Sequence, residues 1–221
     1  MRNLQIHLRD LNPEMVAAWK TAFKDCPVTI SEGHIFFDPD NTDLGGFNPV
    51  IADALVSPAN SFGFMDGGID MVYTRALGWD LSKRLRDLIQ LNYSGELLVG
   101  QAAIIDIPLI ENLPISKNFK YLISAPTMRV PMDVSRTVNA YLAFKAVLRE
   151  AIQHPSISSI LCPGLGTAIG LMDTKVCAKQ MRAAWDEIDS SGLWRAPKYE
   201  TLTEAFRHHA TITPYFRGDD V

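Results

Sequence analysis

The chain has 221 residues and a mass of 24.6 kDa, which at about 150 residues per domain suits one decorated domain rather than two. Its composition, 47% hydrophobic and 21% charged, is typical of a soluble globular protein and excludes the disordered, collagen-like and coiled-coil classes. Because 21 basic and 25 acidic side chains leave a net charge of −4, the basic field that supplies most nucleic-acid affinity is missing, and we expect no duplex nucleic acid to bind through a basic patch.

The first half of the chain predicts strands that alternate with helices. Residues 4–8 alternate between apolar and polar side chains, which predicts a half-buried strand, and a helix is expected to open at Asn12 or Pro13. Residues 28–37 are strand-like, and the turn formers in residues 38–49 predict a loop. Residues 52–58 are nearly all apolar, as in strands that a parallel sheet buries on both faces. An apolar stripe then predicts one long helix from about residue 69 to residue 91.

The second half continues this alternation. Strands are expected at residues 102–107, 121–125 and 157–162. Helices are expected at about 135–153, with Ser135 as the cap, and at 173–188, opened by the capping pair Asp173-Thr174. The tail from Ser190 has weak periodicity, and we expect it to wrap the domain. Strands and helices in this order predict an α/β fold with a largely parallel central sheet covered on both faces.

Ligands of such sheets bind outside the carboxyl ends of the strands, so the loops that follow the strands are the candidate sites. The first such loop runs from Ser57 into the predicted long helix. Gly67 and Gly68 leave backbone amides open to a ligand, and the helix start that follows favours an anion. Asp70 is a candidate functional carboxylate, although the helix dipole alone would also favour it there. Asn60 is either a polar ligand contact or a turn former.

Two further loops follow predicted strands. Residues 163–170, Pro-Gly-Leu-Gly-Thr-Ala-Ile-Gly, offer flexible amides and the Thr167 hydroxyl, which suit a diphosphate; the alternative is a tight turn. A Rossmann site is not indicated because no clear strand with a ribose-binding acid follows, and the Gly-Lys-Ser/Thr of a Walker A loop is also missing. In residues 125–131, Arg129 could pair with a phosphate, but an isolated Arg between prolines is more often a surface ion-pair residue.

The cysteines and histidines predict neither a disulfide framework nor a metal site. Cys26, Cys162 and Cys177 are odd in number and form no CxxC pair, and the five histidines are scattered or adjacent. We therefore expect buried thiols, no metal and no cofactor. No stretch approaches 18 apolar residues, and the first residues lack the core of a signal peptide, so we expect a cytoplasmic protein that does not use a membrane.

Two of these loops resemble the signatures of macro domains, which are ADP-ribose-binding α/β/α modules. The run Asp53-Ala-Leu-Val-Ser-Pro-Ala-Asn-Ser61, followed by Gly67-Gly-Ile-Asp70, is similar to D-A-I-V-N-A-A-N-S followed by G-G-G-V-D. Asp70 follows Asn60 at the spacing of the MacroD-like hydrolytic branch. Residues 163–170 resemble the P-x-x-S-T-G-type phosphate loop, and Gly33-His34-Ile35 is similar to the G-D-I triplet that meets the adenine.

The resemblance covers about residues 28–188 and implies one three-layer α/β/α sandwich over residues 1–221, with a mixed, largely parallel sheet and with both ends of the chain as additions. Asn60 would bind the distal ribose, and Asp70 would orient or activate the attacking water. Backbone amides of residues 164–170 would hold the diphosphate. The implied ligand contacts are Gly33, His34, Ile35, Ser61, Gly67, Gly68, Ile69, Pro163, Gly164, Leu165, Gly166, Thr167, Ala168, Ile169 and Gly170.

The sequence departs from the family pattern at several of these positions. Ser57 stands where the family usually has Asn, and His34 replaces the acid that commonly receives the adenine amino group. Ala168 lies where the loop usually has a Gly, and Leu171 supplies no aromatic ring beside the distal ribose. Asp66 adds a carboxylate close in sequence to Asp70, and two neighbouring acids can raise the pKa of one of them.

Three functions are open at this stage. The first is a metal-independent hydrolase that removes ADP-ribose from a modified macromolecule or acts on a small ADP-ribose derivative. The second is a non-catalytic reader of ADP-ribose. The third is a macro fold used for assembly or partner binding. Asp70 at its family spacing favours the hydrolase, whereas the substitutions at His34 and Ala168 keep the third function open.

Overall fold

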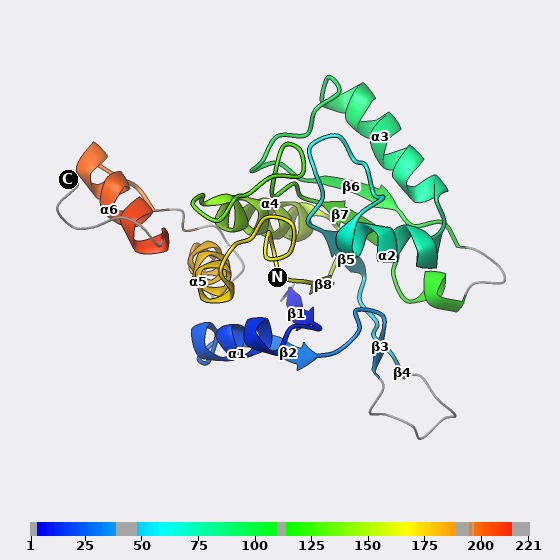
Figure 1. Cartoon of the computed structure of the whole chain (residues 1–221), viewed down its shortest axis with the longest axis horizontal. Coiled ribbons are helices and arrows are strands. Elements are labelled where there is room, and N and C mark those ends of the chain that lie inside the picture. The colour runs from blue at the N-terminus through cyan, green and yellow to red at the C-terminus, as the bar shows by residue number, and fades with distance from the viewer. Residues whose placement is uncertain (1–3, 39–47, 110–113, 189–194, 196, 214–221) are drawn as a thin grey trace.

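The computed structural model of the chain describes residues 4–38, 48–109, 114–188, 195 and 197–213. Six strands form the main sheet in the order β2-β1-β8-β5-β7-β6, and all neighbours pair in parallel except β6 and β7 (Figure 1). These strands are β1 (Gln5–Asp10), β2 (Thr29–Glu32), β5 (Ala54–Ser57), β6 (Ala103–Asp106), β7 (Tyr121–Ser124) and β8 (Ser159–Cys162). A separate antiparallel pair consists of β3 (Phe37–Asp38) and β4 (Asn48–Pro49).

Helices cover both faces of the sheet. They are α1 (Pro13–Ala22), α2 (Gly68–Leu77), α3 (Asp80–Asn92), α4 (Asn139–Gln153), α5 (Thr174–Trp185) and α6 (Leu202–Ile212), with one 3-10 turn, η1 (Pro114–Lys117). The buried side chains of α1, α4 and α5 form one core with one face of the sheet, and those of α2 and α3 form a second core with the other. Figure 1 shows the two groups of helices on opposite sides of the strands. The fold is therefore the predicted three-layer α/β/α sandwich.

The central strand β5 shows why the sheet needs both layers. All four of its residues are buried, with Val56 in the core of α1, α4 and α5 and Leu55 in the core of α2 and α3. Successive side chains of a strand point to opposite faces, so an apolar strand of this kind is stable only between two helical layers. Burial on both faces also explains why the sequence of this strand is a nearly continuous apolar run.

The N-terminal segment is part of the sheet rather than an addition to it. Strand β1 lies between β2 and β8 and pairs with both. Helix α1 places Trp19, fully buried, in the core beside α5. The expectation that the core begins near residue 28 is therefore wrong, because the family-like motifs start later in the chain than the sheet does.

The single long helix predicted over residues 69–91 is two helices, α2 and α3. Gly78 ends α2 with φ of 96° and ψ of 145°, while its N–H bonds the carbonyl of Thr74 at 2.9 Å. That region of backbone space is open almost only to glycine. The apolar stripe continues across the break because both helices pack on the same face of the sheet, which is why the periodicity concealed it.

Other boundaries also differ from the predictions. The strand expected at 28–37 is shortened to β2, and most of the loop expected at 38–49 lies outside the described residues. Helix α4 begins at Asn139 rather than at Ser135. Ser135 instead lies in a turn before the helix, where its N–H donates to Oδ1 of Asp133 at 2.8 Å. Helix α6 is an element that weak periodicity missed, although Thr201 and Glu204 form a capping box at its start.

Helix α6 is attached to the edge of the domain through α5. Its last residue, Ile212, is buried, and the Gln180 side chain donates hydrogen bonds to the carbonyls of Ile212 and Thr137 at 3.0 and 2.7 Å. Figure 1 shows α6 at the periphery, beyond α5 and away from α2 and α3. Among the residues that the structure describes, no helix has the combined length and apolar character needed to cross a bilayer.

Replacing Gly78 with Ala tests the origin of the helix break. A Cβ is disfavoured at these dihedral angles, so Gly78→Ala should lower the free energy of unfolding by about 1–3 kcal/mol in urea titrations. Gly67→Ala is the matched control, because Gly67 has an extended φ of −141° and a Cβ there would meet no atom within 4 Å. Equal stability of the two variants would contradict the argument.

Candidate functional site

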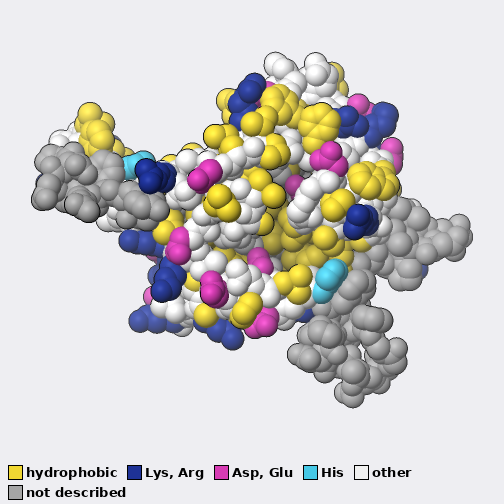
Figure 2. Space-filling view, in the orientation of Figure 1, with side chains coloured by type: hydrophobic (Ala, Val, Ile, Leu, Met, Phe, Trp, Pro, Cys, Tyr) yellow, Lys and Arg dark blue, Asp and Glu magenta, His cyan; other side chains and the backbone are white. Residues whose placement is uncertain are grey.

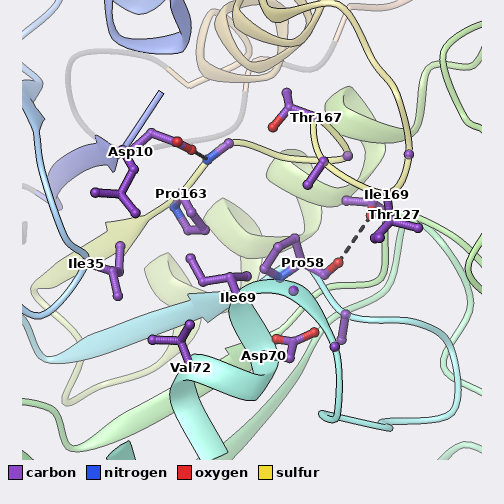
Figure 3. Close-up of a pocket in the computed structure, with 18 of the residues that line it drawn as sticks. Asp10, Ile35, Pro58, Ile69, Asp70, Val72, Thr127, Pro163, Thr167 and Ile169 are labelled. Carbon is purple, nitrogen blue, oxygen red and sulfur yellow. Dashed lines mark hydrogen bonds between the residues drawn. The ribbon is translucent and has the colours of Figure 1, made fainter. Parts of the chain in front are cut away.

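A cavity of about 450 Å³ opens at the carboxyl edge of the sheet. Its walls are the end of β1, the segment after β2, and the loops after β5 and β8. Figure 2 shows hydrophobic side chains gathered in and around a hollow near the centre of this face. In Figure 3, Asp10 and Ile35 lie at one end of the cavity and Ile169 and Thr127 at the other. The size is within the range of small-molecule sites.

Most of the predicted site residues meet in this cavity. Ser61 and Leu165 do not line it and are buried instead; the Ser61 N–H bonds the carbonyl of Arg129, and the Leu165 carbonyl accepts from the thiol of Cys177. The predicted residues that do line it are Gly33, His34, Ile35, Asn60, Gly67, Gly68, Ile69, Asp70, Pro163, Gly164, Gly166, Thr167, Ala168, Ile169 and Gly170.

The start of helix α2 presents free amide groups to the cavity. The first backbone bond of the helix runs from Met71 N–H to the Gly67 carbonyl, so the amides of Gly68, Ile69 and Asp70 precede the helical ladder. Among the described residues, no side chain caps this end of the helix. Unpaired N–H groups and the positive end of the helix dipole together attract an anion.

The loop after β8, residues 163–170, supplies the second set of amides. Two of its carbonyls are bonded within the loop, Gly166 by Met172 N–H at 3.0 Å and Ala168 by Leu171 N–H at 3.1 Å. Within the described part of the chain, the amides of residues 166–170 have no hydrogen-bond acceptor. Hydrogen bonds to its carbonyl groups therefore hold the loop in place, and its N–H groups remain available to a ligand.

The first amide of that loop already has an acceptor. Gly164 N–H donates to Oδ2 of Asp10 at 2.9 Å, and Oδ1 of Asp10 accepts from Asn12 N–H at 2.9 Å. A carboxylate from the end of β1 therefore occupies one of the amides predicted to hold a diphosphate. A bound diphosphate would have to use the amides beyond Gly164.

Asp70 is a buried carboxylate at the wall of the cavity, with 7% of its surface exposed. Its Oδ1 accepts a hydrogen bond of 2.5 Å from the hydroxyl of Ser57, the last residue of β5. Burial raises the pKa of Asp70 to about 7; the Ser57 bond opposes that rise, and the charge of Asp66 adds to it. A carboxyl with such a pKa can exchange a proton near neutral pH.

Asn60 has its side chain turned into its own loop. The amide Nδ2 donates to the Phe64 carbonyl at 2.8 Å, and Oδ1 accepts from the N–H groups of Phe62 and Phe64 at 3.1 and 3.3 Å. This is the work of a turn former, which the sequence left open as an alternative to a ribose contact. The residue still lines the cavity, and its role toward a ligand stays a prediction.

The segment Gly33-His34-Ile35 forms the wall next to β1. Arg9, almost fully buried, holds it through a bond from Nε to the His34 carbonyl at 2.9 Å. A Cβ on Gly33 would collide with the Arg9 guanidinium, so glycine is needed for this close approach. Burial, and then the Arg9 charge, lower the pKa of His34, which keeps the imidazole neutral at pH 7.

Sequence reasoning missed the contribution of β1 to the cavity. Arg9, Asp10, Leu11 and Asn12 all line it, at the carboxyl end of the first strand. The rule that ligands bind beyond the carboxyl ends of strands applies to β1 as well, but no motif drew attention to this exit. Other lining residues that were also missed are Val72 on α2 and, in the loops after β5 and β7, Pro58, Phe64, Thr127, Met128 and Pro131.

Replacing Asp70 with Asn tests the burial of its charge. Below about pH 4 the carboxyl is protonated in both the folded and the unfolded chain, whereas between about pH 4 and 7 only the unfolded chain ionises, so the wild type loses stability as the pH rises. Asp70→Asn removes this loss and keeps an acceptor for Ser57. Its stability advantage should grow with pH and level off above pH 7, at up to about 4 kcal/mol.

Thermal unfolding of both proteins between pH 4 and 9 provides the measurement. Asp87→Asn is the control, since Asp87 is an exposed acid on α3 paired only with Lys83 four residues earlier. A wild type and an Asp70→Asn variant whose melting temperatures differ by the same amount at every pH would show that Asp70 has an ordinary pKa.

The chain was compared with known proteins. The sequence model of the family described as "Macro domain" matches residues 56–181, more than half of the chain. An uncharacterized protein of Aquifex aeolicus is 30% identical over 62% of this chain and 74% of its own length. An uncharacterized protein of Aeropyrum pernix is 30% identical over 74% of this chain and 79% of its own length.

Solved structures share the fold. The macrodomain of Mycobacterium tuberculosis DarG superposes with a TM-score of 0.51 at 20% identity, over 64% of this chain and 88% of that one. The Thermosipho africanus DarTG structure, in complex with ADP-ribose, has a TM-score of 0.51 at 14% identity, over 77% of this chain and 47% of that one. The family match carries the assignment and these likenesses support the fold: the chain belongs to the macro domain family.

Proposed function

We propose that this macro domain binds ADP-ribose in the cavity and hydrolyses ADP-ribosyl linkages, either on modified macromolecules or on small ADP-ribose derivatives. The observation that carries the proposal is the convergence of two sets of unpaired amides, at the start of α2 and in residues 166–170, on a cavity that also contains the buried carboxyl of Asp70. The Thermosipho africanus DarTG structure, which shares the fold, is a complex with ADP-ribose.

The electrostatics of the cavity suit a diphosphate held by backbone amides. Among the lining residues Arg9 is the only Lys or Arg, and its guanidinium is engaged with the His34 carbonyl and the Ser31 hydroxyl. The net charge of −4 argues against capture by a basic surface. Local N–H dipoles therefore have to supply the attraction, as they do in other phosphate-binding loops.

Hydrolysis would need one water and one base. Asp70 would remove a proton as the water oxygen forms a bond to the anomeric carbon of the distal ribose and the bond to the leaving group breaks. Amides that anchor the diphosphate would hold that carbon against the water, which lowers the barrier through orientation. A carboxyl with a pKa of about 7 is well matched to general-base catalysis near neutral pH.

A reader without turnover is the second candidate. It is favoured by the Asn60 side chain, which is bound within its own loop and would have to change its bonds to contact a ribose. The two candidates agree on ADP-ribose binding and differ only in release of the product. The expected cytoplasmic location stays a prediction.

Calorimetry with free ADP-ribose tests the binding. We expect a dissociation constant near micromolar, equivalent to about 8 kcal/mol. Gly170→Ala should weaken binding by at least about tenfold, because the new Cβ would lie 2.5 Å from the Gly166 carbonyl oxygen and displace amides of the loop. Gly78→Ala is the control, since it strains a glycine that does not line the cavity. A wild type that gives no heat with ADP-ribose would refute both candidates.

Release of ADP-ribose from an automodified transferase tests the catalysis. Asp70→Asn should lower the rate by about 10²–10⁴-fold while calorimetry still detects ADP-ribose. Because the base acts when ionised, the wild-type rate should fall as the pH drops below about 7. Asp87→Asn should release ADP-ribose at the wild-type rate. If the wild type binds ADP-ribose but releases none from the transferase, the non-catalytic reader is the remaining candidate.

A further inference from the structure

The hydroxyl of Ser57 is the polar side-chain group that contacts the Asp70 carboxylate. Ser57 is fully buried at the end of β5, and its Oγ donates to Oδ1 of Asp70 at 2.5 Å. That distance is at the short end for a hydroxyl donating to a carboxylate, where such bonds are strongest. No Lys or Arg pairs with Asp70 among the described residues, so this hydrogen bond is the side-chain contact that offsets the burial of the charge.

The bond from Ser57 leaves the other carboxylate oxygen for the cavity. Oδ2 of Asp70 has no partner among the described side chains and amides, yet it is absent from the buried atoms that lack a partner. An oxygen with neither burial nor a partner has to be the one that reaches the cavity that Asp70 lines. Fixing Oδ1 therefore fixes the direction of Oδ2.

The neighbouring groups cannot replace Ser57 in this role. Tyr73, one turn along α2, donates its hydroxyl to the Val56 carbonyl at 2.9 Å. Thr74 bonds the backbone carbonyl of Asp70 at 3.2 Å rather than its carboxylate. Asp66, on the segment before α2, is an acid and repels the ionised form of Asp70. Without Ser57 the carboxyl would lose the hydrogen bond that holds Oδ1 and would favour its neutral form more strongly.

We propose that Ser57 is a positioning residue for the proposed hydrolysis: its hydroxyl holds Oδ1 of Asp70 so that Oδ2 points into the cavity toward the attacking water. This inference rests on the proposed function and deepens it. Ser57 itself does not line the cavity, so it acts on the proposed reaction through Asp70.

The test follows the Asp70 carboxyl directly and then the reaction. Full-length protein carrying ¹³C-labelled aspartate is titrated by NMR, and the Asp70 signal is assigned by its loss in Asp70→Asn. The variants are Ser57→Ala, Ser57→Thr, which keeps the hydroxyl, and Ser57→Cys, a nearly isosteric weak donor that serves if the alanine variant is unstable. Ser124→Ala is the matched control, because Ser124 lies beside Ser57 on β7, is fully buried, and has an Oγ without a partner.

We expect Ser57→Ala to move the Asp70 titration to higher pH by about one to two units, as loss of one hydrogen bond to a charge implies. The acid limb of the pH profile for ADP-ribose release should move by the same amount and kcat should fall about tenfold, with KM little changed. Ser57→Thr should restore both, and Ser124→Ala should change neither. A purely structural role would lower the melting temperature without moving either titration.

An Asp70 titration that is the same in Ser57→Ala as in the wild type would overturn the proposal. A shifted titration in a protein that releases no ADP-ribose would support the coupling of Ser57 to Asp70 and would count against the hydrolysis instead. The NMR measurement needs no turnover, so failure of this inference and failure of the proposed function give different results.

Discussion

The parallel pairing of β5 with β8 is the constraint on which the rest of this structure depends. Their register aligns Ala54 with Ile160 and Leu55 with Leu161, so the two strands run in one direction and end at the same edge of the sheet. The segments that follow them, the start of α2 and residues 163–170, are therefore brought to one cavity from sequence positions about a hundred residues apart. Antiparallel strands would have sent these two loops to opposite edges.

In the proposed function, backbone groups rather than charged side chains attract the anion. The chain is acidic overall, and the one guanidinium in the wall is used to hold the segment at His34. The Asp10 carboxylate accepts a hydrogen bond from the Gly164 amide, so one N–H of this loop already contacts a carboxylate oxygen. A domain of negative charge can thus bind a phosphate ligand because N–H dipoles act over a few ångströms and net charge is screened by solvent.

The buried position of Asp70 lowers the stability of the fold and, in the proposed function, makes the carboxyl a better base. Burial that raises its pKa toward neutrality also destabilises the ionised carboxylate, and one hydrogen bond from Ser57 is what limits this cost. The same carboxyl would be stable but chemically unsuited if it were exposed, because an ordinary aspartate is too weak a base near pH 7. Strained or costly groups of this kind are expected at functional sites.

The sequence by itself determined the layered architecture and most of the loops of the site. Apolar runs and stripes predicted the strands around Val56 and Ile160 and the packing faces of the helices, because burial follows from side-chain type and period. Glycines and prolines marked the loops, because turn chemistry is local, and the resemblance to the family pattern pointed to Asn60 and Asp70. It could not reveal that Gly78 divides a continuous stripe, since one glycine does not change the period.

Tertiary structure alone decided which groups share the cavity. Strand β1 entered the sheet between β2 and β8, which brought Arg9 and Asp10 to the site without any motif. The tertiary structure also pairs Ser57 with Asp70 and turns the Asn60 amide into its own loop. It places the Gly164 amide within hydrogen-bond distance of Asp10. These partners are set by where strands end in space, and hydrogen-bond choice depends on distances that a sequence pattern does not contain.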